Sequence, residues 1–279
     1  MKTAALTTKA KLRRLIYAVP GMRRLRTALG RLMNTPDFDG WGMVTHTFPP
    51  WHGDGNKNAA DFSRGHEKIL RDVTTGKFTL SQFQGHESIE RVLGGLMWRH
   101  YLVFWSARYA AQHCNQKIAT LVECGVCDGL TASFAMKSID SPFRAYLYDA
   151  WAGMQGGSSM AETKMAGNYD YLELEVTKAN LREFEDSIVF IQGYIPGSFS
   201  SAGLPDAICW LHIDLNAASP TKATLETMFD RMLPGSVVLF DDYAWHAHAE
   251  TKSVVDAFFA NKSGALLPFP TGQAVFFKT

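Results

Sequence analysis

Short apolar runs alternate with segments of helical pattern from residue 118 to the end of the chain, and this alternation most constrains the fold. We expect strands at 119–124, 145–149, 188–192, 207–214, 237–242 and 274–278, with helices beginning near Thr131, Met160, Thr221 and His248. Strands that alternate with helices predict an α/β fold, in which helices cover both faces of a mostly parallel sheet. Ligands of such sheets bind beyond the carboxyl ends of the strands.

The N-terminal part differs in composition from the rest of the chain. Residues 1–36 hold nine of the 28 Lys and Arg residues and none of the 27 Asp and Glu residues. A basic arm of this kind can contact a membrane, a nucleic acid or an acidic protein surface. We favour packing of the arm on the body of the protein or on a second subunit, which gives a homodimer, over membrane contact, and we expect no nucleic-acid partner.

Residues 61–115 have the broad apolar stripe of helices. We therefore expect two units, a basic arm with a helical extension or lid over 1–115 and a ligand-binding α/β domain over 116–279. No run reaches the roughly 18–20 apolar residues of a membrane span, and no secretory signal is evident, so we expect a cytoplasmic protein. Cys124 and Cys127 form a C-x-x-C pair with no second pair at zinc-ligand spacing, which argues against a structural zinc site.

A glycine-rich turn follows the first expected strand and gives the first indication of a ligand. Its pattern is E-x-G-x-x-x-G, with Glu123, Gly125 and Gly129, and it matches neither G-x-G-x-x-G nor a phosphate-binding loop ending in G-K-[ST]. The second strand ends in Asp149, 24 residues after Gly125. A carboxylate at that strand end can accept both hydroxyls of a ribose, or it can cap the next segment. The turn and the acid together indicate an adenosine-containing cofactor.

Polar residues also close the later strands. Gln192 and Gly193 end the third strand, and we place them in the cofactor site. Asp214 ends the fourth strand, and Asp241 and Asp242 end the fifth. Adjacent carboxylates repel each other, and a divalent cation such as Mg²⁺ would relieve that repulsion. The alternative is that one aspartate caps a helix while another binds loop amides. Two histidines follow this cluster, His246 and His248, either of which can act as a ligand, a general base or a surface residue.

The order of these motifs resembles that of the macrocin O-methyltransferase family (TylF/MycF-like) of class I methyltransferases. The segments that carry the resemblance are VECGVCDGLT, YLYDAWAG, IQGYIPGSF, LHIDLNAASPTKATLE, LPGSVVLFDDYAW and LPFPTGQAVFF, and they span roughly residues 118–279. The resemblance implies a Rossmann-like sheet of seven strands with the last antiparallel, S-adenosylmethionine as donor, Mg²⁺ dependence, and methylation of a hydroxyl on a sugar or natural product.

The resemblance also implies roles for single residues. Glu123, Gly125 and Gly129 would line the cofactor loop, and Asp149 would hold the ribose. Asp214, Asp241 and Asp242 would bind the metal. The chain departs from the family at Asn216, where an acid is common, and at the small residues 217–219 that follow.

We therefore expect an S-adenosylmethionine-dependent, Mg²⁺-dependent O-methyltransferase that acts on a small hydroxyl-bearing acceptor. Methyl transfer is a displacement on a sulfonium, so the protein must align the two reactants and accept the proton of the hydroxyl. Asp214 is the leading candidate for the catalytic base, and His246 is the second. Two alternatives are a Rossmann-type NAD(P)-dependent oxidoreductase and a non-catalytic protein that retains the cofactor fold.

Overall fold

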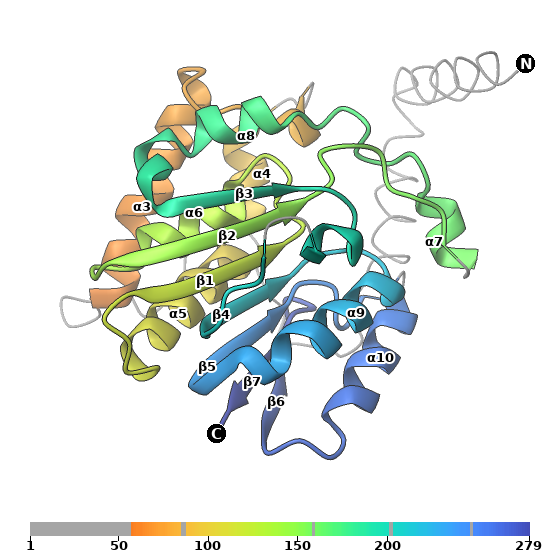
Figure 1. Ribbon diagram of the computed structural model, residues 1–279. Coiled ribbons are helices and arrows are strands. Elements are labelled where there is room, and N and C mark those ends of the chain that lie inside the picture. Colours follow the sequence, from red (N-terminus) through yellow and green to blue (C-terminus); the bar gives the residue numbers. More distant parts are fainter. Residues whose placement is uncertain (1–56, 85–87, 158–159, 201–202, 246–247) are drawn as a thin grey trace, which may run out of the picture.

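A seven-stranded sheet forms the centre of the computed structural model, which describes residues 57–84, 88–157, 160–200, 203–245 and 248–279 (Figure 1). The strand order is β3-β2-β1-β4-β5-β7-β6. The strands are β1 (Ala119–Cys124), β2 (Phe143–Asp149), β3 (Ile188–Gln192), β4 (Ile208–Ile213), β5 (Met232–Phe240), β6 (Gly264–Pro268) and β7 (Ala274–Lys278). Strands β1 to β5 pair in parallel, and β7 runs antiparallel to both β5 and β6. This arrangement confirms the expected Rossmann-like fold.

Helices cover both faces of the sheet (Figure 1). The first face carries α3 (Lys57–Thr74), α4 (Ile89–Gly95), α5 (Met97–His113), α6 (Leu130–Lys137) and α8 (Leu174–Asn180), and the second carries α9 (Ala218–Met228) and α10 (Ala249–Phe259). The short α7 (Met160–Met165) lies beyond the carboxyl edge of the sheet. Short 3-10 helices complete the set: η1 (Ser81–Phe83), η2 (Arg182–Ser187), η3 (Gly197–Ser200) and η4 (Phe229–Arg231).

The core has two layers because successive side chains of a strand point to opposite faces. In β1, Leu121 packs with the α5 and α6 side, whereas Val122 packs with the α9 and α10 side. In β5, Val237 and Val238 divide in the same way. Strands that are buried on both faces read as continuous apolar runs, which is why the sequence located most of them.

Two features of the sheet differ from the expectation. The fifth strand was expected at 237–242, but β5 begins at Met232 and ends at Phe240. Its pairing with β4 passes from Ile208↔Met232 to Trp210↔Val237, so the intervening residues form an irregularity inside the strand. The edge strand β6 was not located from the sequence, because only three apolar residues stand between Gly264 and Pro268, and four of its five residues are exposed.

The helical residues before β1 belong to one covering layer of the sheet. Helix α5 contacts β1, β4 and β5, and it packs along α6. No helix among the described residues is long and apolar enough to cross a membrane. The basic arm and His246 lie outside the described residues. The homodimer, the membrane contact and the division at residues 115 and 116 therefore stay predictions.

Candidate functional site

A pocket of about 530 Å³ lies at the carboxyl edge of the sheet. Its lining comes from the loops that follow β1, β2, β3, β4 and β5, together with residues of α5 and of the segment before α7. Gly125, Asp149, Asp214, Asp241 and Asp242 all line this one pocket. The fold thus brings together most of the residues that the sequence indicated, because the strands that precede them run parallel.

The two glycines of the loop after β1 occupy positions that exclude side chains. Gly125 has φ 89°, and a Cβ placed on it would lie 1.8 Å from the carbonyl oxygen of Asp214. Gly129 has φ 85° and stands before the first residue of α6, where a Cβ would lie 2.9 Å from Leu181. Both need glycine because positive φ and close backbone approach are inaccessible to other residues without strain. The loop can therefore pass close to β4 and to a ligand.

Asp149 organises this loop through its carboxylate. Its Oδ2 accepts hydrogen bonds from the amides of Val126 at 2.7 Å and Cys127 at 2.9 Å. Its Oδ1 accepts from the amide of Trp151 at 2.8 Å. Each carboxylate oxygen has two lone pairs, so the contacts among the described residues leave one acceptor position, on Oδ1. Asp149 can therefore bind one hydroxyl of a ribose while it holds the glycine loop in shape.

Trp151 supports the same loop through its side chain, although no sequence pattern had marked it. Its side chain is buried, and its indole nitrogen donates to the carbonyl oxygen of Cys127 at 3.2 Å and to the hydroxyl of Thr177 at 2.8 Å. Thr177 donates in turn to the same carbonyl at 2.7 Å. A tryptophan two residues after the strand-end acid could have signalled this role, because a buried indole N–H needs a partner.

Glu123 and Gln192, which we expected in the cofactor site, make contacts with other parts of the protein. Glu123 is only 1% exposed, and its carboxylate contacts Nδ1 of His212 at 3.0 Å, directly across from β1 to β4. Gln192 donates to the carbonyl oxygen of Ala150 at 3.4 Å. Neither residue is part of the pocket lining, whereas Gly193 is. Their contact with a cofactor stays a prediction.

The segment before α4 is attached to the glycine loop by a second network. Asp128 accepts from the amide of Ser81 at 2.5 Å and from its hydroxyl at 2.9 Å. The amide group of Asn180 joins the carbonyl oxygens of Thr79 and Asp128, each at 2.8 Å. These bonds place Gln82 in the pocket wall. No local sequence pattern shows this contact, because it joins residues 47 to 101 positions apart.

The segment that contains α7 closes one side of the pocket. Glu162 is buried, lines the pocket and accepts a hydrogen bond from the amide of Ser219 at 3.1 Å. Ser219 lies in the first turn of α9, whose N-cap residue Ala217 provides no capping side chain. An acid from another segment therefore satisfies one of the free amides of this helix start.

Asp214, Asp241 and Asp242 gather at the ends of β4 and β5, and their environments differ. Burial and the charges of the other two acids raise the pKa of Asp214 well above its ordinary value. Burial followed by the charge of Asp241 raises the pKa of Asp242 to about 7. Burial acts in the same direction on Asp241, but Arg99 and His212 together outweigh it and lower the pKa of that carboxyl.

Arg99 is the residue that the sequence analysis missed at this cluster. It comes from α5, and its Nε and Nη2 atoms bind the two oxygens of Asp241 at 2.7 and 2.5 Å. Nη2 also lies 2.8 Å from Oδ2 of Asp214. Burial opposes its charge, but Asp241 and Asp214 keep the pKa of Arg99 above its ordinary value. A lone arginine in the apolar segment 92–105 was the available signal.

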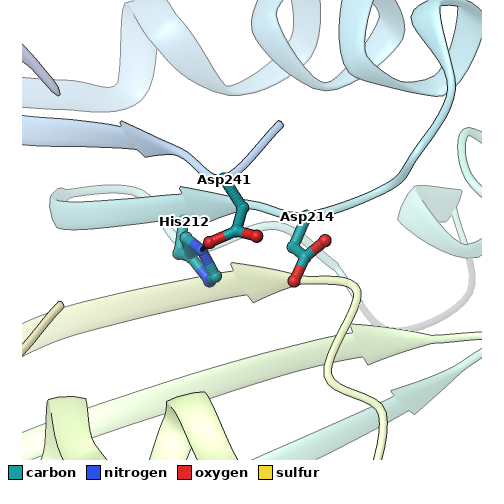
Figure 2. Close-up of side chains that lie close together, drawn as sticks. All are labelled: His212, Asp214 and Asp241. Carbon is teal, nitrogen blue, oxygen red and sulfur yellow. Dashed lines mark ion pairs between the residues drawn. The ribbon is translucent and has the colours of Figure 1, made fainter. Parts of the chain in front are cut away.

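His212 lies beside the acids (Figure 2). Burial alone would lower the pKa of its ring, but the carboxylates of Asp241 and Glu123 raise it to about 10. Ligand atoms of His212, Asp214 and Asp241 lie within 4.8 Å of one another, a spacing that could hold a metal ion. Figure 2 shows the Asp241 carboxylate between the other two side chains, with its ion pair to His212 at 3.9 Å.

His248 also lines the pocket, with its Nε2 atom 3.9 Å from Oδ1 of Asp242. Burial lowers the pKa of its ring below the ordinary value. Of the two histidines that the sequence singled out, His248 is the one among the described residues, and it lies near Asp242. The role of His246 as a base stays a prediction.

Comparison with known proteins agrees with this geometry. Residues 122–243 match the family model described as a methyltransferase domain. No curated protein matches the chain in sequence. Among solved structures, the O-methyltransferase NovP has a TM-score of 0.62 at 16% identity, with 80% of this chain and 99% of NovP covered. The calicheamicin methyltransferase CalS11 has a TM-score of 0.50 at 17% identity, with 86% of this chain and 98% of CalS11 covered.

These likenesses to solved structures concern the fold, and the family match concerns the sequence of the region that holds the pocket. The matched residues run from β1 to the loop after β5, so they include the glycine loop, Asp149 and all three acids. The family match supports a methyltransferase domain over residues 122–243, and the likeness to NovP supports the Rossmann-like fold.

Proposed function

We propose that this chain transfers the methyl group of S-adenosylmethionine to a hydroxyl oxygen of a small acceptor, a sugar or another natural product. The observation that carries the proposal is the single pocket that joins the glycine loop and Asp149 to the acids of β4 and β5. A donor in the first part and a hydroxyl in the second would share one pocket. That is the geometry an in-line transfer between two bound molecules requires.

The donor half of the pocket fits an adenosine-containing sulfonium compound. Gly125 lets the loop after β1 pack against the backbone of Asp214, and Asp149 keeps one acceptor position for a ribose hydroxyl. When bound, S-adenosylmethionine would supply an electrophilic methyl carbon on a positively charged sulfur. The carboxylates of Asp214 and Asp242 in the same pocket would stabilise a positive charge there.

The acceptor half offers Asp214 as the base. Its Oδ2 atom binds Arg99, while Oδ1 has only a contact of 3.4 Å from the Asn216 amide among the described residues. Oδ1 can therefore take the proton of a hydroxyl. The hydroxyl oxygen forms the new bond to the methyl carbon, and the electrons of the broken carbon–sulfur bond stay on sulfur. His248 lies in the same pocket and is the second candidate.

The three acids do not offer the free set of oxygen ligands that the predicted magnesium site requires. Two of them already share the guanidinium of Arg99, which takes both oxygens of Asp241. A cation between Asp214 and Asp241 would need the oxygens that Arg99 occupies. We therefore assign no step of the reaction to a metal.

Two further observations support O-methylation over the alternatives. NovP is an O-methyltransferase and CalS11 is a calicheamicin methyltransferase, and both share the fold. An NAD(P)-dependent oxidoreductase is not favoured, because the family match describes a methyltransferase domain and the sheet carries an antiparallel β7 between β5 and β6. A non-catalytic role is disfavoured by the acids that line the pocket beside the donor site.

Thermal-shift measurements with S-adenosylhomocysteine and with NAD test the proposal. We expect the melting temperature to rise with S-adenosylhomocysteine and to stay constant with NAD, because only a ligand that binds the folded state stabilises it. A methyl-labelled donor incubated with a panel of sugars and phenols then tests the reaction. A shift with NAD alone would contradict the proposal. Label on nitrogen rather than on a hydroxyl oxygen would refute the O-methyl part.

A further inference from the structure

We propose that Arg99 is the resident cation of the acid cluster, and that it keeps a divalent metal out of the space between Asp214 and Asp241. Methyl transfer would then proceed without a metal. The inference rests on the proposed function for the reaction, but the metal-binding claim concerns the described residues alone.

Arg99 contacts both oxygens of Asp241 and one oxygen of Asp214. Its Nε atom donates a hydrogen bond to Oδ1 of Asp241 at 2.7 Å, and its Nη2 atom forms an ion pair with Oδ2 at 2.5 Å; we call this two-point contact the fork. Nη2 also donates to Asp214 at 2.8 Å and so bridges the two carboxylates. The planar guanidinium can hold two carboxylates at once, because its donors are fixed in direction. Lysine could supply the charge but not the fork.

The arrangement is enclosed and supported from other elements. The side chain of Asp241 is 7% exposed, that of Asp214 18% and that of Arg99 27%. Gln273, which is fully buried, donates to Oδ1 of Asp241 at 3.0 Å. With Arg99 Nε on the same atom, both lone pairs of Oδ1 are in use. The partners on Asp241 therefore come from α5 and from the loop before β7, so the fold itself holds the fork in place.

A metal ion and Arg99 are alternatives at this point because they need the same atoms. A magnesium ion requires near-octahedral oxygen ligands at about 2.0–2.1 Å. The oxygens of Asp241, and Oδ2 of Asp214, face Arg99 instead. Asp242 is left outside the fork, and its buried Oδ2 atom has no hydrogen-bond partner among the described residues. A cation could approach Asp242, but Arg99 holds the other two of the three acids that the sequence assigned to the metal, Asp214 and Asp241.

Arg99 also has a consequence for the reaction. By holding Oδ2 of Asp214, it leaves Oδ1 as the oxygen that can take the acceptor proton. Arg99 is therefore a positioning residue, which acts through Asp214. In metal-assisted sites the ion lowers the pKa of the hydroxyl, whereas here the carboxylate must take the proton as the new bond forms.

Binding of Mn²⁺, followed by the loss of the free-ion EPR signal, tests the inference on the full chain. We expect any Mn²⁺ binding by wild type to be weak and to be the same in Asp241→Asn. We expect Arg99→Met, which keeps a long side chain but removes the fork, to bind Mn²⁺ about tenfold more tightly or better. Arg91→Met, an exposed position on α4, serves as the matched control and should behave as wild type. Turnover in excess EDTA should equal turnover in buffer.

Two results would overturn the inference. The first is Mn²⁺ binding by wild type that Asp241→Asn abolishes. The second is an Arg99→Met variant that binds S-adenosylhomocysteine, and is therefore folded, but takes up no more Mn²⁺ than wild type does. If Arg99→Met does not fold, the comparison of Mn²⁺ binding by wild type and by Asp241→Asn tests the inference alone. Failure of the proposed function is separate, because it would appear as absent S-adenosylhomocysteine binding by wild type.

Discussion

Asp149 is the residue whose replacement tests the donor site most sharply, and Asp149→Asn is the change to make. The side chain keeps its size, but one oxygen becomes an NH₂ group and the charge is lost. If the remaining oxygen keeps the amides of Val126 and Cys127, the NH₂ group faces the amide of Trp151, and two donors then meet. The last acceptor position, which we assign to a ribose hydroxyl, disappears as well.

The expected magnitude follows from these contacts. A hydrogen bond to a charged group contributes about 1.5–3 kcal/mol. Loss of the one bond to the ribose should therefore weaken S-adenosylhomocysteine binding by about 10- to 150-fold. The contact between donors at Trp151 should also lower the free energy of unfolding by about 1–3 kcal/mol. The two effects are measured separately, because the second exists without ligand.

Isothermal titration with S-adenosylhomocysteine gives the affinity, and urea unfolding of the ligand-free protein gives the stability. Asp206→Asn is the control, because it makes the same chemical change at a fully exposed side chain outside the pocket. An Asp149→Asn protein that is folded and binds the ligand as tightly as wild type would refute the assignment of Asp149 to the donor.

Three further changes test the fold around the pocket. Gly125→Ala should lower the free energy of unfolding, measured in urea, by about 2–5 kcal/mol, because the backbone is strained and the new Cβ overlaps the end of β4. Gly76→Ala is the control, because Gly76 has a similar φ of 72° but open space around it, so alanine should cost only the strain. Equal losses of stability in the two variants would refute the close approach of Gly125 to Asp214. Asp128→Ala should cost about 1–3 kcal/mol by releasing the segment before α4, and an unchanged midpoint would contradict that docking. Burial lowers the pKa of His100, so below about pH 6.5 the unfolded chain takes up a proton that the folded chain does not. The free energy of unfolding should then fall by up to about 1.4 kcal/mol per pH unit; His100→Phe should reduce that slope, whereas His113→Gln at an exposed position should not.

The parts of the fold that the sequence predicted are those in which local pattern and tertiary structure agree. Three expected strands, 119–124, 188–192 and 274–278, have the bounds that the structure gives. Strands that are covered on both faces are apolar along their length, so their pattern does not depend on their neighbours. The edge strand β6 is mostly exposed and depends on its pairing with β7, which no local pattern reveals.

The same distinction applies to the candidate site. The acids of β4 and β5 could be placed together because parallel strands end at one edge of the sheet. Arg99 could not, since 115 residues separate it from Asp214 and 142 from Asp241. The partner of Glu123 depends on strand register, which sets it opposite His212. The sequence therefore predicted the cluster of acids but not Arg99, whose positive charge balances them. It predicted a metal ion in the place of that charge.

A crystal structure with S-adenosylhomocysteine tests the central claim most directly. We predict that the ribose lies within hydrogen-bond distance of Oδ1 of Asp149, that the ligand follows the loop from Gly125 to Gly129, and that its sulfur faces Asp214. A ligand bound elsewhere, or a sulfur turned away from the acids, would contradict the account.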